Sequence, residues 1–565
     1  MTILARDPSV LDPATGHMLR AVVDVPASRL DLGPRGPRFY VIDFDASEES
    51  LHDPLDLAPN PEPAPGWGYH DAFAGRPDAD LLTNPGFRAQ NVYAIAARTL
   101  ATFEAALGRP VPWAFPNSQL NLVPAAFAEA NAYYSREDQA LYFGYFKAPR
   151  NELVRTSLAH DIVAHETTHA ILDGLRRRFD VPGMPDQAGF HEGFADVVAL
   201  LSILAVPESI GALVGRPSDG SLSSDELTIE ALRGSVLFTI GRQFGDAVHE
   251  TRGGGLRRSI EITPTNEWLR PHNREWQEPH RRGEIFAAMV MQAFLGVWTA
   301  RLAPILGPAV DRGRVVEEGA RAARHLLEMC IRAIDYCPPI DFDYADFLAA
   351  LLASDKEVSP DDPHQYRQAV IDAFGAFGLR ASALKSVRIK LKEWPSYRSF
   401  SYAALRSDPD EAFRFVWENV GLLSVDQRFY LNIENVRPSV RVGPRGFVVA
   451  ETVVDYVQEL ILSAAEFNAI CASEAPAIKA PSSIPSGTQL KLWGGGTIIF
   501  DEFGALKYQH AKPLADWRRQ AARLAYLVDR GWWDTKGRIG FSYGDSLGER
   551  FVALHASGDN PDETW

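Results

Sequence analysis

The segment DIVAHETTHAILDGL, residues 161–175, constrains the fold more than any other part of the chain. Its apolar residues recur at helical spacing, and together with the residues before it the segment predicts a helix over 156–175. His165 and His169 are four positions apart. On a helix, this spacing places both imidazoles on one face, where they can reach a common metal ion. Glu166 follows the first histidine, where a carboxylate can accept a proton from water at that ion.

A catalytic zinc site needs a third protein ligand and an open fourth position. A further histidine in the pattern His-x-x-Gly-x-x-His would supply it, but His169 is followed by AILDGLRRRF. Instead, the segment GFHEGFADVVALL opens a second predicted helix over 189–204. Glu192 and Asp196 share one face of this helix. We expect Glu192 to be the third ligand and Asp196 to accept the far N–H of a ligand histidine, with His165 as the first choice.

Each half of this pattern also has a plainer explanation. Two buried histidines can be satisfied by backbone groups, and two acidic residues near a helix start are favoured by the helix dipole. The two halves together, in this order, favour a zinc site held by His165, His169 and Glu192.

The composition limits the classes of partner. The chain has 565 residues, of which 46% are hydrophobic, and a formal net charge of -16. We expect no nucleic-acid partner, because phosphate binding needs clustered Lys and Arg. The three cysteines include no Cys-x-x-Cys pair, which excludes a cysteine-only zinc site. The most apolar stretch, Ile285 to Val297, is too short to span a bilayer, so we expect a buried helix and no membrane insertion.

The N-terminal sequence indicates no signal peptide. Arg6 and Asp7 interrupt it before an apolar core of secretory length can form. A low, odd cysteine count is typical of a reducing compartment. These features predict a cytoplasmic protein, or one exported without a signal peptide.

Local patterns divide the chain into four predicted parts. They are a loop-rich β segment at 1–90, a lobe at 91–205 that carries the histidine helix, an α-helical lobe at 206–384, and an α+β accessory region at 385–565. Strands are predicted at 38–44, twice within 131–146, and at 439–454 and 489–509, with tight turns at Gly494–Gly496 and Gly504. Further helices are predicted at 91–107, 284–306, 315–335, 344–352 and 364–377.

VAHETTHAILDG followed by EGFAD resembles the thermolysin-like zinc metallopeptidases, or gluzincins, in which Glu-x-x-x-Asp on the next helix completes the metal site. NAYYSREDQALYFG resembles the family's edge strand that aligns peptide substrate, with Asn131 and Ala132 at its Asn-Ala position. GLRRSI resembles a segment whose arginine contacts a substrate carbonyl; Arg257 is the better match and Arg258 the second choice. PHRRGEIFAAMVMQAFL resembles the segment of the transition-state histidine, here His280.

The resemblance covers roughly residues 85–380. It implies an α+β fold with a two-lobed catalytic unit, whose N-terminal lobe is mixed β/α with a central active-site helix and whose C-terminal lobe is mainly helical. It also implies a zinc-dependent endopeptidase that acts on peptide or protein substrates, with Glu166 as general base and His280 stabilising the oxyanion. Another zinc amide or ester hydrolase, or a catalytically retired binding protein stapled by zinc, stays open. Region 385–565 carries no recognisable chemistry and binds an unidentified partner, regulates access or packs on the catalytic unit.

Three features depart from the family pattern. His191 replaces the asparagine that usually precedes the third ligand. The oxyanion-assisting tyrosine has no clear counterpart, since Phe179 and Asp180 lie near its place. No acidic cluster can be mapped as a calcium site, so a calcium requirement stays open. Apart from the resemblance, the auxiliary residues have ordinary explanations as a turn residue (Asn131), a loop arginine (Arg257) and a surface histidine (His280).

Overall fold

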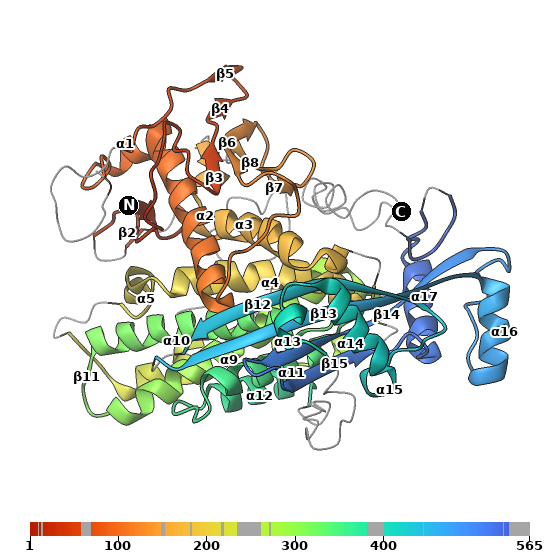
Figure 1. Cartoon of the computed structure of the whole chain (residues 1–565). Helices are drawn as coiled ribbons and strands as arrows, with labels where there is room; N and C mark the ends of the chain where they lie inside the picture. The colour runs from red at the N-terminus through yellow and green to blue at the C-terminus, as the bar shows by residue number, and fades with distance from the viewer. Residues whose placement is uncertain are drawn as a thin grey trace.

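The computed structural model describes residues 1–8, 11–12, 15–57, 69, 71–147, 153–180, 183–215, 220–233, 262–270, 273–380, 400–443, 446–534 and 536–541. Helices and strands both contribute large parts of the fold, which confirms the predicted α+β class. Figure 1 shows the N-terminal strands at the top, most helices below them, and four long strands across the front.

The N-terminal part is built on a mixed sheet with strand order β5-β4-β6-β8-β7, to which β3 adds beside β6 and β9 beside β8. β6 runs parallel to β8, whereas β7 is antiparallel to β8 and lies at the edge. The hairpin β7–β8 confirms the two strands predicted within 131–146. The strands are β3 (Phe39–Val41), β4 (Phe44–Asp45), β5 (Ser50–Leu51), β6 (Leu120–Phe127), β7 (Ala132–Ser135), β8 (Ala140–Lys147) and β9 (Leu153–Arg155), while β1 (Thr2–Leu4) pairs separately with β2 (Arg20–Val22).

The helix α2 (Pro85–Leu107) contacts strands β3 and β6 of this sheet and also contacts α3 (His160–Leu175), the first helix of the candidate metal site. It begins before the predicted start, because the Asn84 side chain accepts a hydrogen bond from the Phe87 amide and Pro85 occupies the first turn. It ends as predicted at Gly108, whose φ of 67° is left-handed.

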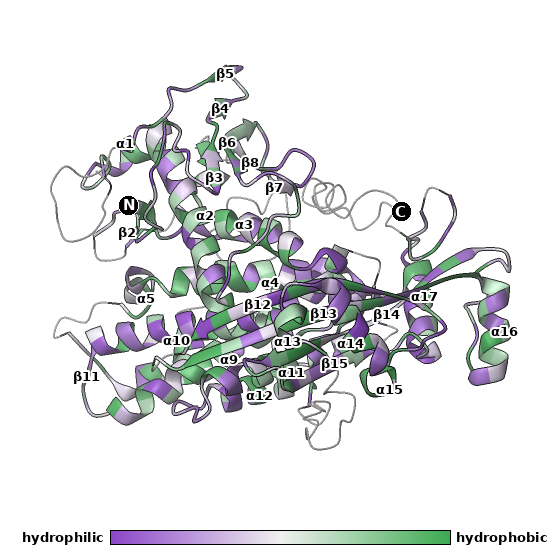
Figure 2. Ribbon diagram, in the orientation of Figure 1, coloured by the Kyte–Doolittle hydropathy of each residue, from purple (hydrophilic) through white to green (hydrophobic). Residues whose placement is uncertain are grey.

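The helical part is packed around α9 (Pro279–Leu302). The segment Pro279–Ile305 is long and apolar enough to cross a membrane, but 78% of its most apolar window is buried inside the protein. α10 (Arg312–Ala333) alternates hydrophilic and hydrophobic residues along its length, as expected for a helix with one face on the core (Figure 2). The remaining elements of this part are α4 (Pro185–Leu204), α5 (Pro207–Leu213), α6 (Ile229–Leu232), α11 (Tyr344–Val358), α12 (Tyr366–Ala376), β10 (Ser221–Leu222) and β11 (Val310–Asp311). The short helix α1 (Asp78–Thr83) belongs to the N-terminal part, where it contacts α2.

The C-terminal region forms an antiparallel sheet of four strands in sequential order, which packs on the rest of the protein. On one face, Val453, Ile499 and Tyr508 join the main hydrophobic core. On the other face, Val454 and Phe500 contribute to a second core with the short helices. The elements are β12 (Tyr430–Val442), β13 (Val448–Ser463), β14 (Gln489–Asp501), β15 (Leu506–Lys512), α13 (Tyr402–Leu405), α14 (Pro409–Glu418), α15 (Val420–Leu423), α16 (Ala464–Glu474) and α17 (Trp517–Asp529).

The predicted tight turns at Gly494–Gly496 are wrong, because these residues lie within β14 and pair with β13. Their missing side chains permit close packing instead of a turn. A Cβ on Gly494 would lie 2.5 Å from the Leu514 amide nitrogen, and one on Gly496 would lie 2.6 Å from the Tyr456 hydroxyl. The predicted turn at Gly504 is confirmed, with a φ of 81° between β14 and β15.

Candidate metal centre

Helices α3 and α4 bring His165, His169 and Glu192 together, with their ligand atoms within 4.8 Å of one another. The two Nε2 atoms are 2.9 Å apart, and each lies 3.6 Å from an oxygen of Glu192. Donors around a tetrahedral zinc, with bonds of about 2.0–2.1 Å, are separated by about 3.3 Å. The three side chains therefore fit one small cation. Within the described ranges, no other set of three or more His, Cys, Asp or Glu side chains meets the same distance criterion.

The far nitrogens of both histidines have partners that orient the rings. Asp196 Oδ1 lies 3.0 Å from His165 Nδ1, as the sequence pattern predicts. His169 Nδ1 lies 2.9 Å from Nδ1 of His191, and the two rings are stacked with centroids 5.0 Å apart. If His191 accepts this hydrogen bond, His169 carries its proton on Nδ1 and presents the Nε2 lone pair to the metal. Sequence reasoning noted His191 only as a departure and did not predict this role.

The electrostatics of the site favour positive charge where the donors meet. Burial alone would lower the pKa of His165, but hydrogen bonds to Asp196 and Glu192 outweigh it, and the pKa lies well above its usual value. The charge of Glu166 adds to this rise, which places that carboxylate near the ring. Glu166 is itself only 3% exposed. A site that stabilises a proton on an imidazole in this way also suits a cation, which binds to the deprotonated ring.

His280, at the start of α9, lies beside the same group. Its Nε2 is 3.9 Å from Glu192 Oε2, and its Nδ1 is 2.9 Å from Glu278 Oε1. Burial lowers the pKa of His280, but the hydrogen bond to Glu278 and the charge of Glu192 raise it to about 9. The ring is therefore a cation at neutral pH. Glu278 also caps α9 by accepting from the His280 and Arg281 amides.

Sequence reasoning missed Glu278, although a signal for it exists. An acid directly before Pro279 is typical of a helix start, and this acid lies only two residues before His280.

Glycines explain how α9 comes this close to α4. A Cβ on Gly193 would lie 2.6 Å from the Gly283 carbonyl oxygen, and one on Gly283 would lie 2.8 Å from the Gly193 amide nitrogen. Both distances are shorter than real Cβ contacts. The Gly283 Cβ would also lie 3.1 Å from Cβ of Glu192. The tight crossing therefore lets His280, less than one turn before Gly283, reach the third ligand.

Of the predicted substrate-binding residues, Asn131 and Ala132 lie within the described ranges. Asn131 is buried immediately before the edge strand β7, and its Oδ1 accepts from the Ala132 amide. Strand β7 contacts α3 and is tied to it by a 2.9 Å hydrogen bond from the Tyr134 hydroxyl to Asp173. Arg257 and Arg258 lie outside the described residues.

Phe179, near the place of the missing tyrosine, is buried. Its ring packs edge-on against Phe190, with centroids 5.7 Å apart. Without a polar atom on its ring, Phe179 cannot donate to an oxyanion.

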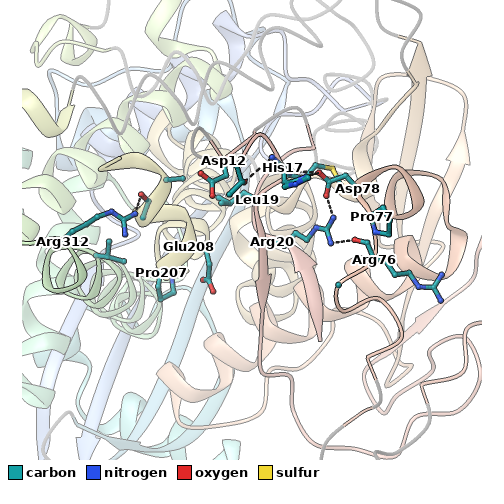
Figure 3. Close-up of a pocket in the computed structure, with 16 residues that line it drawn as sticks. Asp12, His17, Leu19, Arg20, Arg76, Pro77, Asp78, Pro207, Glu208 and Arg312 are labelled. Carbon is teal, nitrogen blue, oxygen red and sulfur yellow. Dashed lines mark hydrogen bonds and ion pairs between the residues drawn. The ribbon is translucent and has the colours of Figure 1, made fainter. Parts of the chain in front are cut away.

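A cavity of about 920 Å³ lies between the N-terminal segment, α5 and α10 (Figure 3). None of the metal-site residues lines it. Its arginines already have partners within the protein, since Arg20 donates to Asp78, Arg76 donates to the Ala72 carbonyl, and Arg312 donates to the carbonyls of Gly211 and Gly215. We therefore assign no ligand to this cavity.

Comparisons of the chain with models of protein families and with curated proteins find no match. The residues of the site itself are therefore the only basis for its chemistry. They are three donors for one cation (His165, His169 and Glu192), the buried carboxylate of Glu166 beside them, and the cationic ring of His280 on α9.

Proposed function

We propose that the chain is a zinc-dependent endopeptidase of the thermolysin-like type. The observation that carries this proposal is the convergence of His165, His169 and Glu192, from two neighbouring helices, with Glu166 and His280 beside them. A purely structural zinc site is closed by four protein ligands and has no use for a base next to it. In this proposal the sheet with α2 and α3 forms one lobe, and the helices around α9 form the other.

The proposed reaction divides the work between two residues of the chain. When bound, zinc polarises the substrate carbonyl and lowers the pKa of a water molecule toward about 7. Glu166 accepts the proton of the attacking water and passes it to the leaving amine. His280, held as a cation by Glu278, donates a hydrogen bond to the carbonyl oxygen as negative charge develops there.

The edge strand β7 supports the choice of a peptide as substrate. It pairs with β8 on one side and contacts α3, which carries two of the three proposed metal ligands. An extended peptide can add to the edge of such a sheet through main-chain hydrogen bonds. Asn131 and Ala132, where β7 begins, are the proposed first contacts for the substrate backbone.

The test is digestion of a peptide library by the zinc-loaded protein, with Glu166→Gln as the matched variant. The glutamine has the same shape but cannot act as a base, so we expect zinc to be retained and cleavage to fall by about 10²–10⁴-fold. A chelator should abolish cleavage by the wild type, and zinc should restore it.

Two outcomes would replace the proposal. Intact peptides together with chelator-sensitive turnover of small amides or esters would indicate a hydrolase of another class. Bound zinc without turnover of any substrate would indicate a zinc-stapled binding protein.

A further inference from the structure

The last turn of α3 is completed by the C-terminal sheet. The final carbonyl groups of a helix have no partner within the helix. The carbonyl of Leu175, the last residue of α3, accepts a 3.3 Å hydrogen bond from Arg437 Nη1 on β12. No glycine ends this helix; its C-cap is Arg176, with a φ of -140°. A cation at this end also complements the negative pole of the helix dipole.

Arg176 joins the same end of α3 to two other elements. Its Nη1 lies 2.7 Å from Asp455 of β13, and Arg437 pairs with the same carboxylate. Its Nε donates to the Ile334 carbonyl at 3.0 Å and its Nη2 to the Cys337 carbonyl at 2.8 Å. The side chains of Arg176 and Asp455 are only 2% and 1% exposed. The end of α3 is therefore fixed in a buried network and not in solvent.

The alternation of side chains along the strands explains why these groups meet α3. Successive residues of a strand point to opposite faces, so Glu451, Val453 and Asp455 share one face of β13. Val453 belongs to the main core, which identifies this face as the one turned toward the helices. Arg437 and Arg441 occupy the corresponding face of β12 and pair with Asp455 and Glu451, respectively.

The network extends beyond α3 and holds the sheet firmly. Asp335, two residues after the end of α10, pairs with Arg109 at 2.6 Å and with Arg441 at 3.2 Å. Glu451 accepts a 2.5 Å hydrogen bond from the Tyr336 hydroxyl. The sheet is thus attached both to the end of α3 and to the turn with Asp335 and Tyr336, and its position relative to α3 is defined.

We propose that the C-terminal sheet is a positioning element of the metal centre, with Arg437 and Asp455 setting the place and rotation of α3 through Leu175 and Arg176. His169 lies two helical turns from Arg176, about 10 Å along a rigid helix. A rotation or slide of α3 would therefore move both imidazoles relative to Glu192 on α4. Arg437 is a positioning residue, because it contacts neither the metal ligands nor a substrate. This inference rests on the metal site of the proposed function but not on peptide cleavage.

The test is the zinc dissociation constant of the full chain, measured by competition with a chromophoric chelator at a temperature where every variant is folded. Mutation of a group that orients a ligand directly typically weakens binding 10–100-fold. For the more distant Arg437→Met we expect about 3–10-fold weaker binding. Arg437→Lys, which keeps one charged donor, should recover part of the loss. The matched control is Arg428→Met, because the partners of Arg428, Asp426 and Glu474, both lie within the C-terminal region.

Each outcome has a distinct meaning. An unchanged dissociation constant in folded Arg437→Met, even with a lower melting temperature, would overturn the inference and leave the sheet a structural support only. A wild-type chain that binds no zinc would instead refute the proposed function.

Hydrogen exchange of the wild type tests the same inference if Arg437→Met does not fold. We expect the amides of the last turn of α3 and those around Asp455 in β13 to exchange in one cooperative step. Exchange of the α3 turn well before β13 would overturn the inference.

Discussion

Among the described residues, α3 takes part in two buried groups of carboxylates that differ in their partners. In the metal centre, the carboxylates of Glu192 and Asp196 meet histidine rings. In the group between the C-terminal sheet and the helices, which we call the docking network, Asp335 and Asp455 meet arginines. Guanidinium groups are permanently charged and neutralise a carboxylate within the protein. A histidine ring can release its proton when a metal ion binds, so the candidate metal centre can exchange that positive charge for an added cation.

The largest expected effect comes from breaking the docking network. Asp335→Ala removes the carboxylate between Arg109 and Arg441 and leaves buried positive charge. Breaking a buried ion pair in this way costs about 3–5 kcal/mol of unfolding free energy. Denaturant titration should show this loss in the metal-free protein as well as with zinc. A loss below about 1 kcal/mol would show that the network adds little to the fold.

The second prediction concerns His280, at the start of α9. His280→Ala should retain zinc and lower kcat/KM by about 10²–10³-fold, because it removes a donor to the developing oxyanion. Steady-state kinetics with a cleaved peptide would measure this loss. Because the ring must be protonated, wild-type activity should fall as the pH rises toward the pKa of about 9, and a bound cation will move this limb to lower pH. An alkaline limb that persists in His280→Ala would assign it to another group.

The third prediction concerns His191, which contacts His169 in the candidate metal centre where the docking network has arginines. His191→Ala removes the partner of His169 Nδ1 and should weaken zinc binding about 10–100-fold. His191→Asn, the residue usual in the resembling family, should restore most of the affinity, since its side chain can accept the same hydrogen bond. Equal zinc dissociation constants for His191→Ala and the wild type would rule out the orienting role.

The smallest effects are those of pH on the stability of the metal-free protein. Arginines hold the pKa of Asp335 well below its usual range despite its burial, so its contribution is complete above the unfolded pKa of about 3.9 and is lost as the pH falls toward the folded pKa. The raised pKa of His280 acts in the opposite direction. Its contribution is complete below about 6.5 and is lost as the pH rises to about 9.

Denaturant titrations at several pH values check both directions. Asp335→Asn should flatten the acid side of the stability profile, and His280→Ala should flatten the alkaline side. If both variants keep the wild-type dependence of stability on pH, these assignments are contradicted.

The local parts of the site could be predicted from the sequence, and its long-range parts could not. The three proposed metal ligands lie on the two predicted helices, and the spacing of four residues that indicated them is a local property. His191 is adjacent to Glu192, yet its role depends on a ring contact with His169 across two helices. Glu278 contacts the His280 ring locally, two residues away, so its role is the one that a local signal could have indicated.

The docking network had no visible signal in the sequence for a related reason. Its partners are far apart in the chain: 226 residues separate Arg109 from Asp335, and 279 separate Arg176 from Asp455. Periodicity indicates which face of a strand is buried but not what it meets. The failure at Gly494–Gly496 is similar, because close neighbours of these glycines lie on β13, on β15 and beyond the end of β15.

The most direct test of the central claim is elemental analysis of the purified wild type and of Glu192→Ala after dialysis against trace zinc. We expect one zinc per wild-type chain and almost none in the variant, because two histidines alone do not complete the site. A wild-type chain without zinc, or a variant that retains it in full, would contradict the claim that His165, His169 and Glu192 bind one common ion.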